Sequence, residues 1–133
     1  MKFARIVFLV AGVWGLMVVL PLYFLFDFVG RSYPPAVTHP DLYYGFVGVT
    51  LVWQIAFLTI ATNPSRYRPI MLAAILEKSV YVATMVTLYV MGELQLGQFA
   101  VAWPDSVLGI LFVAAFVKTP DQSGQRRTSE AYR

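Results

Sequence analysis

The chain has 133 residues, of which 59% are hydrophobic and only 13% are charged. A soluble domain of this size needs about 25% charged residues to cover its surface, so the composition excludes an ordinary soluble domain and indicates a single membrane-embedded one. The chain contains no cysteine, which excludes a disulfide framework, a thiol nucleophile and a thiolate metal site.

The net charge of +3 is explained by where the basic residues lie. Of the ten lysines and arginines, Arg31 lies in a separate loop and Lys78 in an apolar segment. The other eight form three clusters: Lys2 and Arg5; Arg66 and Arg68; Lys118, Arg126, Arg127 and Arg133. Such clustering is typical of the positive-inside rule. It predicts membrane lipid as a partner, and we expect no nucleic acid.

Four apolar segments follow one another along the chain, at 3–28, 42–61, 69–91 and 104–118. Crossing ~30 Å of hydrocarbon takes about 20 helical residues, so the first three are long enough. The first is also too long and too aromatic for a signal peptide, and we expect it to remain in the mature protein. The fold class predicted is all-α, a transmembrane four-helix bundle.

The fourth segment, at 104–118, spans only about 22 Å as a helix. If it were re-entrant, Lys118 and the basic residues after it would share a side with the loop at 92–103, which has no lysine or arginine. A full span places them with the other basic clusters, so we favour it, with "QFAVAW" at the interface. Both termini are then cytoplasmic, and the polar tail at 119–133 is expected to be disordered.

Three loops place a proline near the start of an apolar run: "THPDLYY", "NPSRYRPIM" and "AWPDSVLG". Proline at the first helical position loses no hydrogen bond, and nearby Thr, Ser or Asp side chains can cap the free amides, so these stretches predict helix starts. Pro21 should bend the first helix, which is expected to end near Gly30.

Glu77 and Lys78 are two adjacent charges inside the third apolar segment. On a helical wheel Ala73, Ala74, Tyr81, Thr84 and Leu88 share the face of Glu77, so this carboxyl group is predicted to face the bundle. Lys78 points about 100° away, which predicts that the two charges do not pair with each other and that each finds its own partner or snorkels.

An ionisable residue in the bilayer costs about 2.5 to 3.5 kcal/mol on insertion scales, so Glu77 is a candidate functional residue. We favour a role in helix or subunit contact, in which protonated Glu77 bonds to Thr50 or Gln54 on the polar face of the second helix. A proton or substrate site is the main alternative, and contact with a lipid headgroup or water is a third.

Small residues predict where helices approach closely. Ala11 and Gly15 form such a patch in the first segment, and Gly45 and Gly48 form another in the second, on a different face from Gln54. The second helix is therefore expected to have neighbours on two sides.

His39 is the only histidine, which excludes a bis-histidine haem or a multi-histidine metal site within the chain. Because Pro40 follows it, we interpret His39 as part of a helix start. A single ligand to a magnesium tetrapyrrole, or a weak metal contact shared with another chain, stays open. No nucleophile and base pair is found, so we expect no catalytic site.

The stretches "THPDLYYGFVGVTLVWQ" and "NPSRYRPIMLAAILEKSVY" resemble a group of uncharacterised bacterial four-helix membrane proteins. This resemblance covers residues 38–82 and implies no activity. In size and helix number the chain is also similar to DoxX-like proteins and to small multidrug resistance transporters. The latter carry an essential glutamate in the first helix, where this chain has no carboxylate before Asp27.

The sequence therefore favours a non-catalytic accessory or scaffold subunit of the bacterial inner membrane. Its faces would bind other membrane subunits or a second copy, and a bound lipid, pigment or quinone is open as a cofactor. The first alternative is a small proton-coupled transporter that uses Glu77. The second is an enzyme acting on lipid or quinone, with Glu77 as general base and Lys78 as anion partner.

Overall fold

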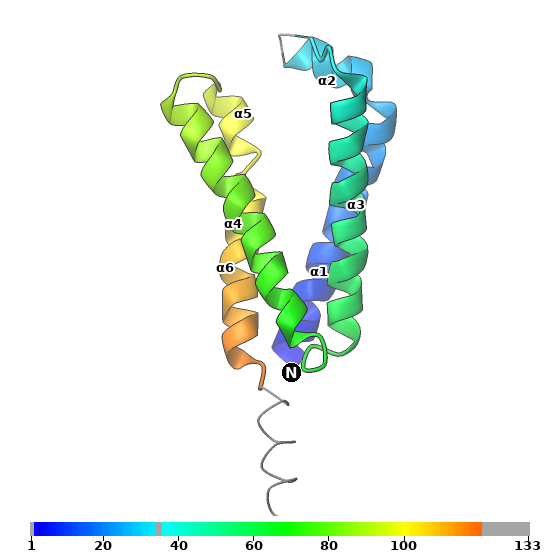
Figure 1. The fold of residues 1–133 in the computed structure, drawn as a ribbon, viewed down its shortest axis with the longest axis vertical. Coiled ribbons are helices and arrows are strands. Elements are labelled where there is room, and N and C mark those ends of the chain that lie inside the picture. The colour runs from blue at the N-terminus through cyan, green and yellow to red at the C-terminus, as the bar shows by residue number, and fades with distance from the viewer. Residues whose placement is uncertain (1, 34–35, 121–133) are drawn as a thin grey trace, which may run out of the picture.

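The chain folds into apolar helices connected by short turns, and the computed structural model describes residues 2–33 and 36–120 (Figure 1). The predicted all-α class is confirmed, with no strand in the described ranges. In chain order the elements are α1 (Lys2–Val19), the 3-10 helix η1 (Leu20–Phe24), α2 (Phe26–Ser32), α3 (Pro40–Thr62), α4 (Arg68–Val90), α5 (Leu96–Ala100) and α6 (Trp103–Lys118).

Proline lies in the first turn of α3, α4 and α6, because its fixed φ suits that turn and its missing N–H has no partner there in any case. The expected side-chain caps are not formed: at these three starts no capping side chain accepts an amide hydrogen bond. Proline geometry, without a polar cap, therefore marks where these helices begin.

The first apolar segment is not one continuous α-helix. The α-helical part ends at Val19, and Pro21 lies in the tighter turns of η1, because its ring disrupts the α-helical hydrogen-bond ladder. Helical structure resumes in α2, which ends at Ser32, two residues beyond the predicted Gly30. The hydroxyl of Tyr43 donates a 2.8 Å hydrogen bond to the Leu22 carbonyl, which ties η1 to α3.

The fourth apolar stretch extends beyond 104–118, because the "QFAVAW" region is itself helical. Backbone bonds from Val101 to Gln98 and from Ser106 to Ala102 link α5 to α6. Together they give a 23-residue stretch, Leu96–Lys118. Four stretches of the described chain are long and apolar enough to cross a membrane: this one, Lys2–Phe24, Pro40–Thr62 and Arg68–Val90.

The helices are arranged as two pairs that diverge from one end, α1 with α3 and α4 with α6 (Figure 1). Where the pairs meet, Phe8, Phe57 and Phe112 are fully buried against one another. The rings of Phe8 and Phe112 stack with centroids 4.4 Å apart, and Phe57 meets Phe112 edge-on at 5.0 Å. These rings join α1, α3 and α6 into one core, above which the pairs separate.

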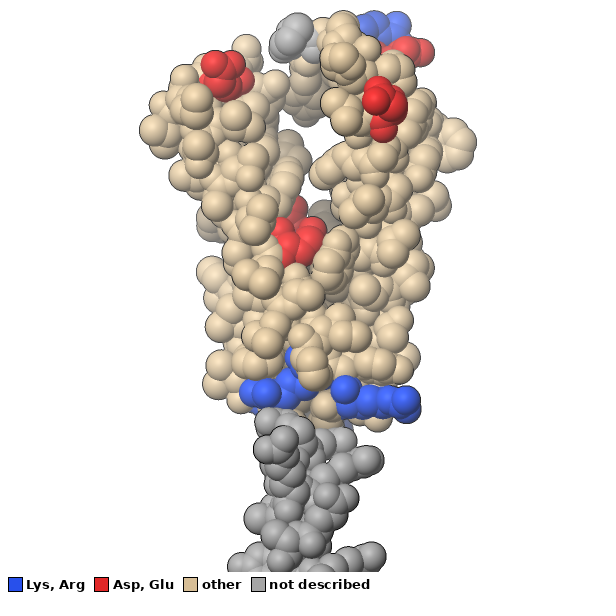
Figure 2. Space-filling view, in the orientation of Figure 1, with Lys and Arg blue, Asp and Glu red and all other residues tan. Residues whose placement is uncertain are grey.

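Basic side chains gather at the closed end of the molecule, where the pairs meet (Figure 2). Arg5 donates a hydrogen bond to the Thr62 carbonyl at 3.2 Å, and Arg68 donates one to the Thr119 carbonyl at 2.9 Å. Both bonds use carbonyls that helix ends leave without a partner. The predicted disordered tail falls almost wholly at 121–133, outside the described residues.

Candidate functional site

Lys78 is the centre of an ion cluster at the base of the space between the two helix pairs. The residue is only 5% exposed. Its ammonium nitrogen lies 2.5 Å from Asp105 Oδ1 in α6 and 3.2 Å from Glu77 Oε2. It also lies 5.4 Å from the centroid of the Phe57 ring, over the aromatic core. We call Glu77, Lys78 and Asp105 the ion cluster.

The prediction that Glu77 and Lys78 do not pair is wrong. Their backbone directions do differ by about 100°, but the flexible four-carbon stem of lysine lets the ammonium group turn toward the neighbouring carboxylate. Lys78 Nζ also donates a long hydrogen bond of 3.4 Å to Glu77 Oε1. Lys78 is buried, so its ammonium group does not extend outward as a snorkelling lysine would.

Asp105 is the site residue that sequence reasoning missed. It follows Pro104 and was interpreted only as part of a helix start. A useful signal was present: if the fourth span begins near residue 96, as the structure has it, Asp105 lies well inside the span. A carboxylate at that depth requires a partner.

The ion cluster contains one more negative than positive group when its three members are ionised. Glu77 Oε2 is buried and accepts no hydrogen bond from any described residue, although it lies within ion-pair distance of Lys78. Among the described residues that line the adjoining cavity, Lys78 is the only cationic one. The cluster can therefore accept a proton or a positively charged group.

The cluster borders a cleft between the two helix pairs, with a cavity volume of about 300 Å³. Figure 2 shows the cleft open between the pairs, with acidic side chains at its base. All four long helices contribute to it, and most of the wall is apolar. Its lining includes Ala11, Trp14, Gly15, Val18, Phe46, Thr50, Gln54, Tyr81, Pro104 and Leu108 besides the ion cluster.

The predicted polar face is only partly assembled. Gln54 is buried, but its amide donates to the Thr50 carbonyl of its own helix at 2.9 Å. No hydrogen bond joins Glu77 to Gln54 or Thr50 in the described chain, so the predicted contact with the second helix is replaced by the contact with Lys78. Tyr81 lines the cleft, whereas Thr84 is exposed and donates to the Val80 carbonyl.

The small residues have different surroundings. Ala11 is buried in the core. A Cβ added at Gly15 would overlap the side-chain amide of Gln54, so the absence of a side chain at Gly15 makes room for this amide of α3. Gly12, which was not predicted, is where the α3 backbone comes close: an added Cβ would lie 3.1 Å from the Gln54 carbonyl oxygen and 2.7 Å from Leu58. Gly48 faces Tyr23, while Gly45 has open space around it.

His39 is exposed at the start of α3, where its backbone carbonyl accepts the amide hydrogen of Tyr43. In the described ranges no three His, Cys, Asp or Glu side chains come together as a metal site would require. In the ion cluster itself, the Lys78 ammonium lies where a metal ion between the two carboxylates would have to bind.

Comparisons with known proteins add no assignment: no protein-family model, no curated protein and no solved structure matches this chain. The chemistry of the site is therefore inferred from the cleft and the ion cluster.

Proposed function

We propose that the protein is a non-catalytic integral membrane protein that acts as an accessory or scaffold subunit. Its outer helix faces bind other membrane subunits, and its cleft binds a smaller ligand. The observation that supports this most is an apolar cleft of about 300 Å³ whose base carries an ion cluster. Apolar walls with a few converging polar groups are typical of binding sites. Exposed Gly45 on α3 adds a flat surface on which a partner helix could pack closely.

Native mass spectrometry of the protein, extracted gently from its own membrane, tests the accessory role. The expected result is a mass that includes larger membrane subunits. A mass of the monomer or homodimer alone, after extraction that keeps known complexes of the same membrane intact, would overturn it.

A second candidate is a small proton-coupled transporter that uses Glu77. It is favoured by a specific feature of the shape: the cleft is open at one end (Figure 2), and the aromatic core lies at its other end. A transporter needs such one-sided access in each of its states. Glu77→Gln should then abolish flux driven by a proton gradient while the protein still folds, and unchanged flux in that variant would exclude this candidate.

We further propose that the protein resides in a bacterial inner membrane with both termini in the cytoplasm. The clustering of basic side chains at the closed end supports this orientation. Because the chain has no cysteine, a single introduced cysteine can be labelled without background from native cysteines. Its labelling then reports on which side of the membrane that position lies. In intact cells an impermeant maleimide should label Arg31→Cys but not Arg66→Cys, and the reverse pattern would invert the topology.

A further inference from the structure

The charge of the ion cluster restricts what the cleft can hold. Two carboxylates, Glu77 and Asp105, share one ammonium group, and no other cationic side chain in the described part of the chain lines the cavity. In a medium of low dielectric constant, an uncompensated negative charge is expensive. A ligand that brings a positive charge therefore gains energy here, whereas an anionic headgroup would be repelled.

The position of Glu77 makes it the contact point for such a charge. Asp105 lies closest to Lys78, at 2.5 Å, whereas Glu77 lies at 3.2 and 3.4 Å from the same nitrogen. Asp105 is therefore the better satisfied of the two carboxylates. Both carboxylate side chains line the cleft, Glu77 at 20% and Asp105 at 25% exposure. The weaker contact with Lys78 is therefore what leaves Glu77 open to a second cation.

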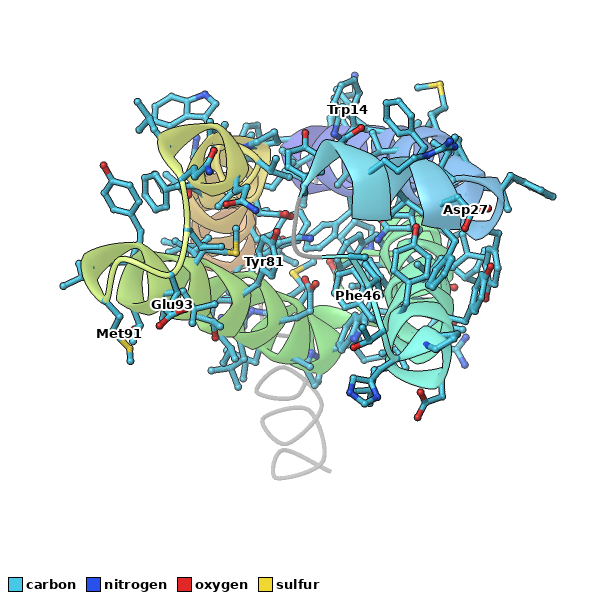
Figure 3. The ribbon with its side chains drawn as sticks, turned by 90° about the horizontal axis from the view of Figure 1, so that it is seen from above. Trp14, Asp27, Phe46, Tyr81, Met91 and Glu93 are labelled. Carbon is cyan, nitrogen blue, oxygen red and sulfur yellow. The ribbon has the colours of Figure 1, made fainter. Side chains whose placement is uncertain are left out.

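The walls of the cleft suit an apolar or aromatic body attached to that charge. Figure 3, which looks into the open end, shows Tyr81 of α4 and Phe46 of α3 on facing sides of the cleft. Aromatic rings pack favourably against another ring, stacked or edge to face, so an aromatic body is held between these two side chains. Phe46 is 53% exposed although it lines the cavity, so part of its ring is available for contact.

The cavity volume sets the size of the ligand. A cavity of about 150 Å³ holds a benzene molecule, so the 300 Å³ observed here accommodates roughly two groups of that size. A transmembrane helix, about 10 Å across with its side chains, would not fit at the base of the cleft without moving the pairs apart.

We propose that the cleft binds a small hydrophobic cation, with its ammonium group against Glu77 and its apolar body between Phe46 and Tyr81. This inference rests on the cleft being a binding site, as the proposed function holds, and it names the chemical class of the occupant. The ligand reaches the site through the open end of the cleft.

The test is a titration of the full chain in lipid nanodiscs with benzyltrimethylammonium and with neopentylbenzene, its uncharged isostere. Calorimetry, with empty nanodiscs subtracted, gives the dissociation constants. The cation should bind saturably at one site per chain and at least ten-fold more tightly than the isostere. Glu77→Gln should weaken cation binding ten-fold or more.

Glu93→Gln is the matched control, since it removes a carboxylate from an exposed position that does not line the cleft. It should leave cation binding unchanged. If Glu77→Gln fails to fold, Phe46→Leu provides a second variant that keeps the ion cluster intact. It should weaken binding about three-fold through loss of the contact between the Phe46 ring and the ring of the ligand.

Three results would overturn the inference: no saturable binding by the folded protein, equal affinity for cation and isostere, or equal effects of the Glu77 and Glu93 variants. Its failure is separable from failure of the accessory role. Cation binding is measured on the isolated chain, whereas the accessory role depends on the subunits that accompany it from the membrane.

Discussion

Lys78 of α4 and Asp105 of α6 form a 2.5 Å ion pair that joins the two helices of one pair at the base of the cleft. The ammonium group is also shared with Glu77 and rests over the Phe57 ring of α3. A single side chain thus connects three helices and fixes the charge of the site. Because unpaired charges in the bilayer are costly, its removal should have a large effect.

Lys78→Met should destabilise the fold by about 3 kcal/mol, because it leaves two neighbouring carboxylates without their cation. Asp105→Asn should cost less, since Glu77 continues to partner Lys78. Unfolding of both variants in mixed micelles with increasing denaturing detergent measures the difference.

In the Lys78→Met variant, the further changes Glu77→Gln and Asp105→Asn should recover most of the lost stability, because no buried charge then remains in the ion cluster. Lys2→Met, at an exposed position near the closed end, serves as the control and should have little effect. Equal stability of the Lys78→Met variant and the unmodified protein would show that the ion cluster is not structurally important.

Gly15→Ala should lower the stability of the α1 and α3 pair by about 1 to 2 kcal/mol. The added methyl group would lie within 1.8 Å of the Gln54 side chain, so the buried amide must move and its bond to Thr50 is strained. Gly45→Ala is the matched control: nothing lies within 4 Å of the new methyl group. Alanine should stabilise the helix at that position by up to ~1 kcal/mol. Equal effects of the two changes in the same unfolding assay would show that the Gln54 amide moves aside without cost.

Phe112→Ala should destabilise the protein by about 3 kcal/mol or more, because it removes the ring that contacts both Phe8 and Phe57. Phe24→Ala makes the same chemical change at a position that is 84% exposed and should be close to neutral. Thermal unfolding followed by circular dichroism compares the two. A similar loss for both variants would mean that the aromatic core does not hold the helix pairs together.

Spin labels at Leu42 and Val90 report the width of the cleft at its open end, and labels at Thr62 and Val117 report the closed end. If the protein is a transporter, saturating benzyltrimethylammonium should shorten the first distance and leave the second unchanged, because the aromatic core keeps the closed end fixed. Double electron–electron resonance measures both. An unchanged distance at the open end would instead favour static binding, as in an accessory subunit.

The sequence alone predicted the all-α class, the four apolar helices, the proline-marked helix starts and an unusual charge at Glu77 and Lys78. These features depend on composition, periodicity and local backbone chemistry, which nearby residues decide. The helix start predicted at Pro104 is confirmed, since α6 begins at Trp103. The predicted fourth span, however, did not extend back through α5 to Leu96. That error also concealed Asp105 as a residue inside the span.

Only the tertiary structure decided which groups meet. It brought Asp105 to Lys78, turned Lys78 toward Glu77 and kept Gln54 bonded to its own helix. These contacts depend on how two helix pairs diverge from the core of Phe8, Phe57 and Phe112, and on the bending of flexible side chains. The divergence of the pairs and the bending of side chains are not encoded in the periodicity of any single helix. The cleft and its charge are therefore visible only once all four long helices are packed together.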